Sequence, residues 1–283
     1  MKHAIHVVII LLFFIFPKSA FSQEIDCTPQ ERLIFEEYVS YITPYKSDSK
    51  EFVLQKTAEF FLGNPYVAGT LDKNTKEKLV INLREFDCVT YIETVIALAD
   101  AAKTNELTFD DFSERLLKIR YRNAELNGYD SRLHYTSDWA RKNVENGILK
   151  PVALDNLVLE TKPIDFMSTH RQAYAALKTD DEMLREIQSV EDNINSRGGF
   201  YYLPKERIES NKDSIPHMAM IAFTTSIKGL DTTHTGFAFK KDGKLTFIHA
   251  SSLKNKIVVD EKSLSEYCKL QKSCTGLIIT QVL

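Results

Sequence analysis

A polar loop at residues 82–87 runs directly into an apolar segment at residues 88–99, and this stretch constrains the fold more than any other. Apolar residues recur along the segment at helical spacing: Val89, Ile92, Val95, Ile96 and Ala99. This spacing predicts a helix that buries one face. Asp87 stands where the N-cap of such a helix belongs, so Cys88 falls in the first helical turn.

Cys88 has two interpretations at this position. Unpaired backbone N–H groups and the helix dipole favour a thiolate at a helix N-terminus, which is the form in which cysteine acts as a nucleophile. A free cysteine can equally be a small buried apolar residue. We take the nucleophile as the working hypothesis and keep the buried residue as its alternative.

Composition and charge exclude some classes of protein. The chain has 283 residues, 43% of them hydrophobic, which is sufficient for one large domain or two small ones. Its formal net charge is −3. A nucleic-acid-binding protein would carry a strong basic excess, so we expect no nucleic-acid partner.

The N-terminus has the pattern of a signal peptide. A short basic start precedes an apolar run at residues 4–16, and small residues follow at Ala20 and Ser22. We expect residues 1–22 to be removed before Gln23, which makes the protein exported and periplasmic. The apolar run is shorter than the ~20 residues of a membrane span. We expect the mature chain, residues 23–283, to be one catalytic domain without a transmembrane segment, and to be a monomer. A retained signal anchor is the alternative.

An oxidising compartment would affect the four cysteines: Cys27, Cys88, Cys268 and Cys274. Cys268 and Cys274 are close enough in sequence to pair with each other, and Cys27 could instead pair with either of them. The spacing leaves these pairings open. If Cys88 is a nucleophile, it takes part in none of them.

Helices dominate the first half of the chain and strands the last third, a pattern typical of an α+β fold with an antiparallel sheet. We expect helices at residues 31–42, 50–61, 108–120, 138–146, 168–177, 181–195 and 260–270. We expect strands at residues 79–83, 152–160, 200–203, 218–225, 233–240, 245–250, 256–259 and 277–282.

Two histidines could serve the cysteine. His234 and His249 fall on predicted strands that a tight turn at Asp242-Gly243 joins into a hairpin. Counted from the turn, they are roughly level, so their side chains can meet on one face. A cysteine nucleophile needs a base, and the base needs an orienting group. We assign His234 as the base and His249 as the orienting group, and Gly236 leaves room beside His234 for a helix end or a substrate.

A zinc site made of Cys88, His234 and His249 is the alternative use of these residues. The sequence contains no Cys-x-x-Cys or His-Glu-x-x-His pattern of the kind that zinc sites often show. We therefore expect no metal and no cofactor. The remaining histidines include His170 and His217, for which we predict no partner.

Residues 121–139 are dense in aromatic and polar side chains and contain Trp139, the single tryptophan of the chain. Loops of this composition often line a binding cleft. A well-packed polar loop is an equal alternative.

Three segments resemble motifs of the NlpC/P60 cysteine hydrolases. Residues 86–90, Phe-Asp-Cys-Val-Thr, resemble the Asp-Cys-Ser/Thr signature of that group. Residues 233–252 resemble its His-x-Gly and Ile-His-Ala run, and residues 64–69, Asn-Pro-Tyr-Val-Ala-Gly, its upstream Pro-Tyr-x-x-Gly segment. More narrowly, three segments resemble the DUF1460 branch of bacterial envelope proteins: residues 80–93, 131–139 and 228–234.

The resemblance implies a papain-like α+β fold in which the cysteine heads a helix packed on an antiparallel sheet. It implies that Cys88 is the nucleophile, His234 the base and His249 the third polar member. Tyr66 matches the tyrosine near the oxyanion site of the family. Two departures are Pro216-His217, where the family usually has Gly-Asp, and extra residues near 72–80.

The branch is similar to N-acetylmuramoyl-L-alanine amidases, which split the amide between muramic acid and the stem peptide of peptidoglycan. Such a substrate carries carboxylates and a sugar, which call for a cation, hydrogen-bond donors and an aromatic platform. The resemblance therefore favours substrate contacts from Arg132, His134, Tyr135, Asp138, Trp139, Asp231 and Thr233, with Arg84 and Glu85 beside the nucleophile.

The sequence thus predicts an exported cysteine amidase that acts on peptidoglycan or muropeptides. An endopeptidase that cuts within the stem peptide is one alternative, because both enzymes use the same site. A non-catalytic peptidoglycan-binding domain is another.

Overall fold

The computed structural model describes residues 25–74 and 76–283, and the predicted signal peptide lies outside these ranges. The α-helices of the described residues are α1 (Pro29–Ile42), α2 (Lys50–Phe60), α3 (Cys88–Ala102), α4 (Phe109–Arg120), α5 (Thr136–Glu145), α6 (Phe166–Thr169), α7 (Asp181–Asn195) and α8 (Leu264–Leu270). The strands are β1 (Ile25–Asp26), β2 (Leu79–Val80), β3 (Leu149–Pro151), β4 (Val158–Glu160), β5 (Phe200–Pro204), β6 (Met220–Thr225), β7 (Thr232–Lys241), β8 (Lys244–Ser251), β9 (Lys256–Val259) and β10 (Cys274–Val282).

One eight-stranded sheet organises the second half of the chain. Its strand order is β4-β5-β10-β6-β7-β8-β9, with β3 paired to β10 as well, and every one of these pairings is antiparallel. The last strand, β10, lies in the middle of the sheet between β5 and β6. The structure therefore confirms the α+β class and the antiparallel sheet.

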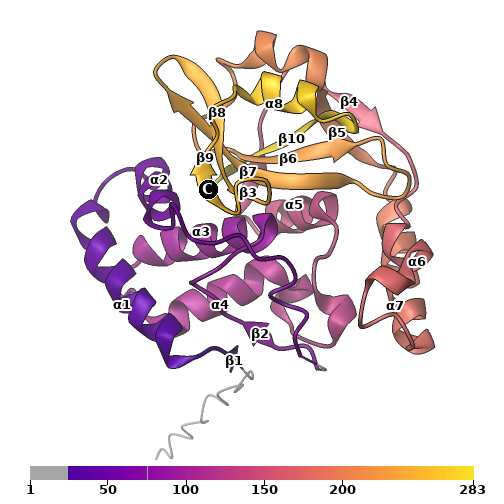
Figure 1. The fold of residues 1–283 in the computed structure, drawn as a ribbon, viewed down its shortest axis with the longest axis horizontal. Coiled ribbons are helices and arrows are strands. Elements are labelled where there is room, and N and C mark those ends of the chain that lie inside the picture. Colours follow the sequence, from indigo (N-terminus) through magenta and orange to yellow (C-terminus); the bar gives the residue numbers. More distant parts are fainter. Residues whose placement is uncertain (1–24, 75) are drawn as a thin grey trace, which may run out of the picture.

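Helices cover both faces of the sheet, as Figure 1 shows, with α1 to α5 below it and α8 above it. The core on the lower side joins the helices to the inward side chains of the strands, such as Phe237 and Ile248. The core on the upper side joins Leu264 of α8 to Phe223 and Phe247. Because side chains alternate along a strand, neighbouring residues of β7 and β8 enter different cores.

The helix α3 lies at the centre of the lower core. Its side chains are buried almost all round, from Thr90 to Ala102, and it packs against α4, α2 and β7. The sequence predicted only one buried face, whereas a helix that is apolar on nearly all sides is typically surrounded by other elements. The N-terminal end of α3 is thereby held against the sheet.

Several predicted elements are confirmed in place and extent. Thr28 caps α1 in a capping box with Glu31, and Asp87 caps α3. The predicted helix at 181–195 is α7, and the predicted strand at 256–259 is β9. The capped helices thus begin where the side chains can satisfy free N–H groups.

Other predictions were wrong in extent. The predicted helix at 168–177 is a single turn, α6, followed by a 3₁₀ turn at Arg171–Ala173. The predicted helix at 260–270 begins only at Leu264, because Ser263 and Glu266 form a capping box at that point. The predicted strands at 79–83 and 152–160 shrink to β2 and β4.

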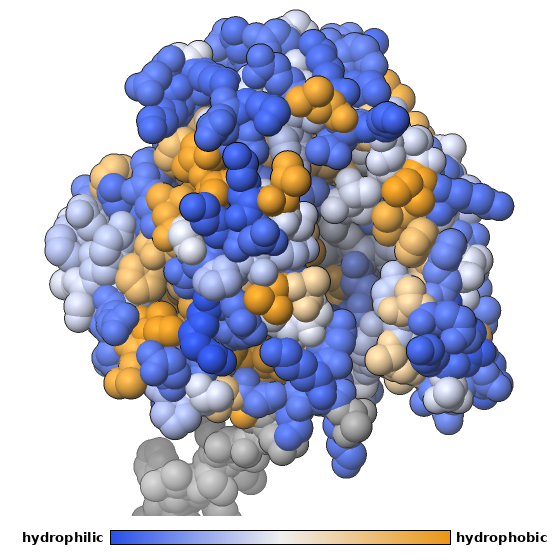
Figure 2. Space-filling view, in the orientation of Figure 1, coloured by the Kyte–Doolittle hydropathy of each residue, from blue (hydrophilic) through white to orange (hydrophobic). Residues whose placement is uncertain are grey.

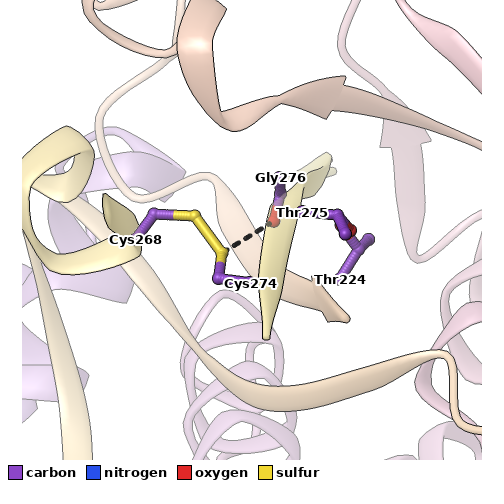
Figure 3. The surroundings of a disulfide bond; sticks show 5 residues. All are labelled: Thr224, Cys268, Cys274, Thr275 and Gly276. Carbon is purple, nitrogen blue, oxygen red and sulfur yellow. Dashed lines mark hydrogen bonds between the residues drawn. A yellow bond between two sulfur atoms is a disulfide. The ribbon is translucent and has the colours of Figure 1, made fainter. Parts of the chain in front are cut away.

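The structure contains one disulfide bond among the described cysteines, between Cys268 in α8 and Cys274 at the start of β10. Figure 3 shows this bond beside the hydrogen bond that joins Thr224 of β6 to Thr275 of β10. Cys27 and Cys88 are free thiols. Of the pairings left open by the spacing, the structure therefore selects the short one, which links α8 to the central strand.

Hydrophilic residues cover most of the face shown in Figure 2, and hydrophobic residues lie among them in small groups. Among the residues that the structure describes, no helix is both long enough and apolar enough to cross a membrane.

Candidate active site

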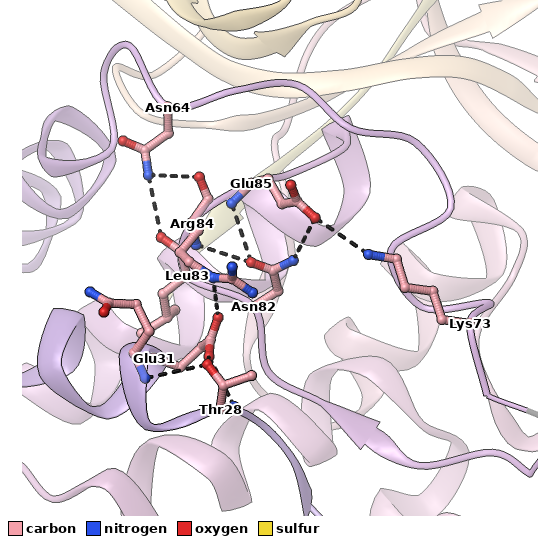
Figure 4. Close-up of polar contacts among 9 residues, drawn as sticks. Thr28, Glu31, Asn64, Lys73, Asn82, Leu83, Arg84 and Glu85 are labelled. Carbon is pink, nitrogen blue, oxygen red and sulfur yellow. Dashed lines mark hydrogen bonds and ion pairs between the residues drawn. The ribbon is translucent and has the colours of Figure 1, made fainter.

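The loop that leads into α3 is fixed by a network of polar contacts, which Figure 4 shows. The Asn82 side-chain oxygen accepts hydrogen bonds from the backbone N–H groups of Arg84 and Glu85, at 3.0 and 3.2 Å. The Arg84 guanidinium lies 2.7 Å from the buried carboxylate of Glu31, while Glu85 lies 3.5 Å from Lys73. Arg84 and Glu85 thus hold the loop in place.

Cys88 is the first residue of α3 and is partly buried. The Asp87 carboxylate accepts hydrogen bonds from the N–H groups of Val89 and Thr90, at 3.0 and 2.8 Å. The buried Thr235 hydroxyl donates to the Cys88 carbonyl at 2.8 Å. Because Thr235 follows His234 in β7, this bond ties the cysteine end of α3 to the strand that carries the histidine.

Tyr66 lies beside this helix end. Its segment runs parallel to the loop before Cys88, with the Val67 N–H bonded to the Phe86 carbonyl at 2.9 Å. On its other side, the Tyr66 N–H donates to the Asn255 carbonyl in the turn after β8 at 3.1 Å. Burial, together with the nearby Cys88 and Asp87, raises the pKa of the Tyr66 hydroxyl, which therefore stays protonated at neutral pH.

The two histidines meet as predicted, but diagonally rather than level. The hairpin register pairs Phe237 with Ile248, which offsets His234 and His249 by two residues. Their Nε2 and Nδ1 atoms are 2.6 Å apart. Gly236 makes room for His249 itself, since a Cβ at Gly236 would lie 3.0 Å from the His249 Cβ and 2.8 Å from the Ile248 oxygen.

The histidine pair is enclosed by groups that the sequence did not predict. Asp260, which follows β9, lies 3.5 Å from the Nε2 of His249. Tyr267 of α8 covers both imidazoles, with ring centroids 6.3 Å from His234 and 5.9 Å from His249. The misplaced helix at 260–270 concealed Asp260, although the Ser-x-x-Glu capping box at Ser263 was a signal that could have placed it outside the helix.

Burial keeps the charged forms of the site residues unfavourable. It raises the pKa of the Cys88 thiol to about 12, with Asp87 acting in the same direction and hydrogen bonds with Thr235 in the opposite one. Burial lowers the pKa of His234 to about 3. The site therefore rests as a neutral thiol and a neutral imidazole, contrary to the thiolate that the helix N-terminus predicted. Within the described residues no hydrogen bond joins the Cys88 thiol to either histidine.

We expect this resting state to govern the alkylation of Cys88. A thiol with a pKa of about 12 is ionised about a thousandfold less at neutral pH than one at its ordinary 9.0. In the Cys27→Ser protein, iodoacetamide should therefore label Cys88 slowly at pH 7, and the rate should rise with each pH unit up to pH 10. Mass spectrometry of quenched samples measures the rate. A rate that is already maximal at pH 7 would show a thiolate and contradict this expectation.

The predicted substrate residues differ in exposure, and most of them are buried. Thr233 is exposed and His134 is half-buried. Arg132, Tyr135, Asp138, Trp139 and Asp231 are buried. Their predicted contact with substrate stays a prediction.

These buried side chains bond within the protein. Arg132 pairs with Asp72 and Glu77, and Tyr135 donates to Glu191 at 2.6 Å. Asp138 pairs with Arg122 and Arg197, while Trp139 lies in the lower core. Asp231 accepts the Ser137 N–H at 2.7 Å and so ties α5 to the start of β7, three residues before His234.

Neither a metal-binding cluster nor the cavity described below coincides with the candidate site. In the described part of the chain, no group of three or more His, Cys, Asp or Glu side chains is arranged to hold a metal ion. A cavity of about 720 Å³ lies between α5, α7, β5 and β10, and none of Cys88, His234 and His249 lines it. The candidate site is therefore defined by its side chains and not by this cavity.

The chain matches a known protein family over most of its length. Residues 56–276 match the model of the family AmiA-like, described as N-acetylmuramoyl-L-alanine amidase-like. No curated protein matches the sequence.

Solved structures are similar over most of the chain. An N-acetylmuramoyl-L-alanine amidase from Bacteroides uniformis is 35% identical, with a TM-score of 0.74 over 81% of this chain and 98% of its own. A Bacteroides fragilis protein provisionally named a xylanase is also 35% identical, with a TM-score of 0.74 over 80% and 98%. A Legionella pneumophila protein of the family DUF1460 is 24% identical, with a TM-score of 0.65 over 89% and 95%, and shares the fold. The chain therefore belongs to the AmiA-like family of N-acetylmuramoyl-L-alanine amidase-like proteins.

Proposed function

We propose that this protein is an exported cysteine amidase that hydrolyses the amide between N-acetylmuramic acid and L-alanine in peptidoglycan fragments. The observation that carries the proposal is the bond from Thr235 to the Cys88 carbonyl, which brings the thiol to the strand of His234. Family membership and the similar Bacteroides uniformis amidase support the same reaction. We also assign the fold to the papain-like NlpC/P60 group on the strength of the motifs around Cys88 and His249.

In the proposed reaction His234 takes the proton of the Cys88 thiol while the sulfur attacks the amide carbonyl. The carbon–nitrogen bond then breaks, and the stem-peptide amine leaves with the proton from His234. A thioester between Cys88 and the muramoyl group remains. Water, activated by His234, hydrolyses it and restores the thiol.

The developing oxyanion needs donors beside Cys88. Asp87 accepts from the N–H groups of Val89, Thr90 and Tyr91, and within the described residues no acceptor takes the Cys88 N–H. We propose that this N–H and the Tyr66 hydroxyl, which stays protonated, bind the oxyanion together.

We propose that His134 and Thr233 contact the substrate directly, because they are the less buried members of the predicted set. Arg132, Tyr135, Asp138 and Trp139 would then hold the loop that forms one wall, and Asp231 would link it to β7. A buried salt-bridged side chain serves this supporting role without any contact to the ligand.

A glycosidase activity, which the name of the Bacteroides fragilis protein would suggest, finds no support at this site. Most glycosidases place two carboxyl groups on opposite sides of the scissile bond. Here Asp87 caps α3 and Asp260 faces His249, so neither carboxylate is free for that task.

The experiment that tests the proposal is a digest of defined muropeptides, analysed by mass spectrometry. We expect free stem peptide and a sugar that ends in the lactyl carboxylate. Fragments split between two amino acids of the stem would instead show an endopeptidase, and the absence of any cleavage would favour a binding domain. The Cys88→Ser protein is the matched control for contaminating hydrolases.

A further inference from the structure

We propose that Asp260 is a positioning residue that sets which nitrogen of each imidazole in the pair carries the proton. The inference rests on the proposed function, in which His234 acts as the base. It extends the Cys88, His234 and His249 set by a carboxylate that would act through His249 and would touch neither the substrate nor the thiol.

Asp260 is held rigidly where β9 ends. Its backbone N–H donates to the Phe247 carbonyl at 2.9 Å, and its Oδ1 accepts the Lys262 N–H at 2.8 Å. Its Oδ2 is thereby left to face the His249 Nε2 at 3.5 Å. The His249 side chain is fully buried, and its Nε2 has no hydrogen-bond partner at shorter range in the described structure.

The carboxylate decides the tautomer of His249. A lone pair on Nε2 would face a negative charge in a buried site, whereas an N–H would be attracted to it. Nε2 of His249 therefore carries the proton, and its Nδ1 is an acceptor. At 2.6 Å from that acceptor, the Nε2 of His234 must in turn be the donor.

The consequence lies at the other ring nitrogen of His234. With the proton on Nε2, the Nδ1 of His234 keeps its lone pair and can accept the proton of Cys88. The imidazolium that forms is stabilised through His249 by the Asp260 charge. Asp260 itself gains no proton, because burial, which raises its pKa, is outweighed by the contact with His249 and the hydrogen bond from the Lys262 N–H, which together hold the pKa below its usual value.

The other titratable groups near the pair stay neutral at pH 7. Burial raises the pKa of Tyr267, on α8, to about 12, with Asp260 and Cys88 adding to the shift. Cys88, on α3, is likewise protonated. Lys262 is a cation that acts on Asp260, whose Oδ1 also accepts the Lys262 backbone N–H. Asp260 is thus the charge that orients the pair.

The test is the substitution Asp260→Asn. The amide oxygen retains the bond from the Lys262 N–H, which turns the NH₂ group toward the His249 Nε2. That nitrogen then becomes an acceptor, both imidazoles reverse their tautomers, and the Nδ1 of His234 loses its lone pair. We expect kcat on a muropeptide to fall about 10²-fold with KM unchanged, which is less than the ~10⁴-fold wrong-tautomer effect of a carboxylate bonded directly to the base, because Asp260 acts through His249.

Nitrogen-15 NMR of labelled histidine supplies a readout that a structural role would not move. In the wild-type protein, His234 and His249 should both show a protonated Nε2 and an unprotonated Nδ1 at pH 7. Asp260→Asn should exchange these signals, and Asp242→Asn, which removes an exposed carboxylate from the same sheet, should not. If the Asp260→Asn protein does not fold, the wild-type spectrum still tests the inference, because a protonated Nδ1 on either histidine would overturn it.

The outcomes separate this inference from the proposed function. An Asp260→Asn protein with unchanged tautomers overturns the inference, whether or not its activity falls. A wild-type protein that cleaves no muropeptide overturns the proposed function, while the NMR signals still test Asp260. Activity that is lost in Cys88→Ser and retained in Asp260→Asn refutes the positioning role alone.

Discussion

Cys88→Ser is expected to lose muropeptide hydrolysis by at least about 10⁴-fold while the protein remains folded. The hydroxyl is a far weaker nucleophile than the thiol, and His234 lies in a buried site in which it cannot easily become charged. Replacement of one heavy atom in a partly buried side chain should change the free energy of unfolding by less than about 1 kcal/mol. Mass spectrometry of the products measures the loss of hydrolysis, and urea unfolding followed by circular dichroism measures the change in the free energy of unfolding.

Cys27→Ser is the matched control for this substitution, because Cys27 is the other free, partly buried cysteine of the described chain. It should retain full activity. A Cys88→Ser protein that is as active as the wild type would refute the nucleophile. A protein that unfolds would support the alternative in which Cys88 is a buried apolar residue. Adding His234→Ala to Cys88→Ser should cause little further loss, since residues that act as one unit are not additive.

The sequence predicted elements whose signals are local. The Asp87 cap and the Asp242-Gly243 turn each depend on a few neighbouring residues, and each predicted its element correctly. The turn predicted that His234 and His249 meet on one face, because register in a hairpin is counted from its loop, but the register offsets them by two residues and does not place them level.

The residues that the sequence did not reveal depend on contacts between distant segments. Arg132 finds its partners Asp72 and Glu77 about sixty residues earlier in the chain, so an exposed binding loop and a buried ion pair have the same local pattern. The pKa of Cys88 was predicted in the wrong direction for a similar reason. The helix dipole is a local property, whereas burial under the sheet is not, and burial dominates here.

Arg120→Met is expected to lower the free energy of unfolding by about 3–5 kcal/mol. Arg120 of α4 lies 2.7 Å from Glu93 of α3, and both side chains are 2% exposed. The guanidinium also donates to the Val80 carbonyl at 2.7 Å. Methionine fills a similar volume but leaves the Glu93 carboxylate buried without its partner. Urea unfolding at pH 7 measures the loss.

Arg115→Met is the matched control, because Arg115 lies on the same helix and pairs with Asp111 and Asp100 in a more exposed position. An exposed ion pair contributes about 0–1 kcal/mol, so its loss should be several-fold smaller. If Arg115→Met and Arg120→Met lower the free energy of unfolding equally, burial of the Arg120 ion pair is not the cause of the loss.

The pH dependence of the stability of the Arg120→Met protein should show that the unpaired Glu93 carboxylate causes the destabilisation. Burial already raises the pKa of Glu93 in the folded protein, against the opposing effect of Arg120, and removal of Arg120 should raise it further. In that variant the folded state binds the proton more tightly than the unfolded state, so its stability relative to the wild type should recover as the pH falls. Glu93→Gln in the same background should abolish this recovery. Because Glu93 lies on the helix that begins at Cys88, loss of the pair is also expected to loosen the helix that carries the thiol.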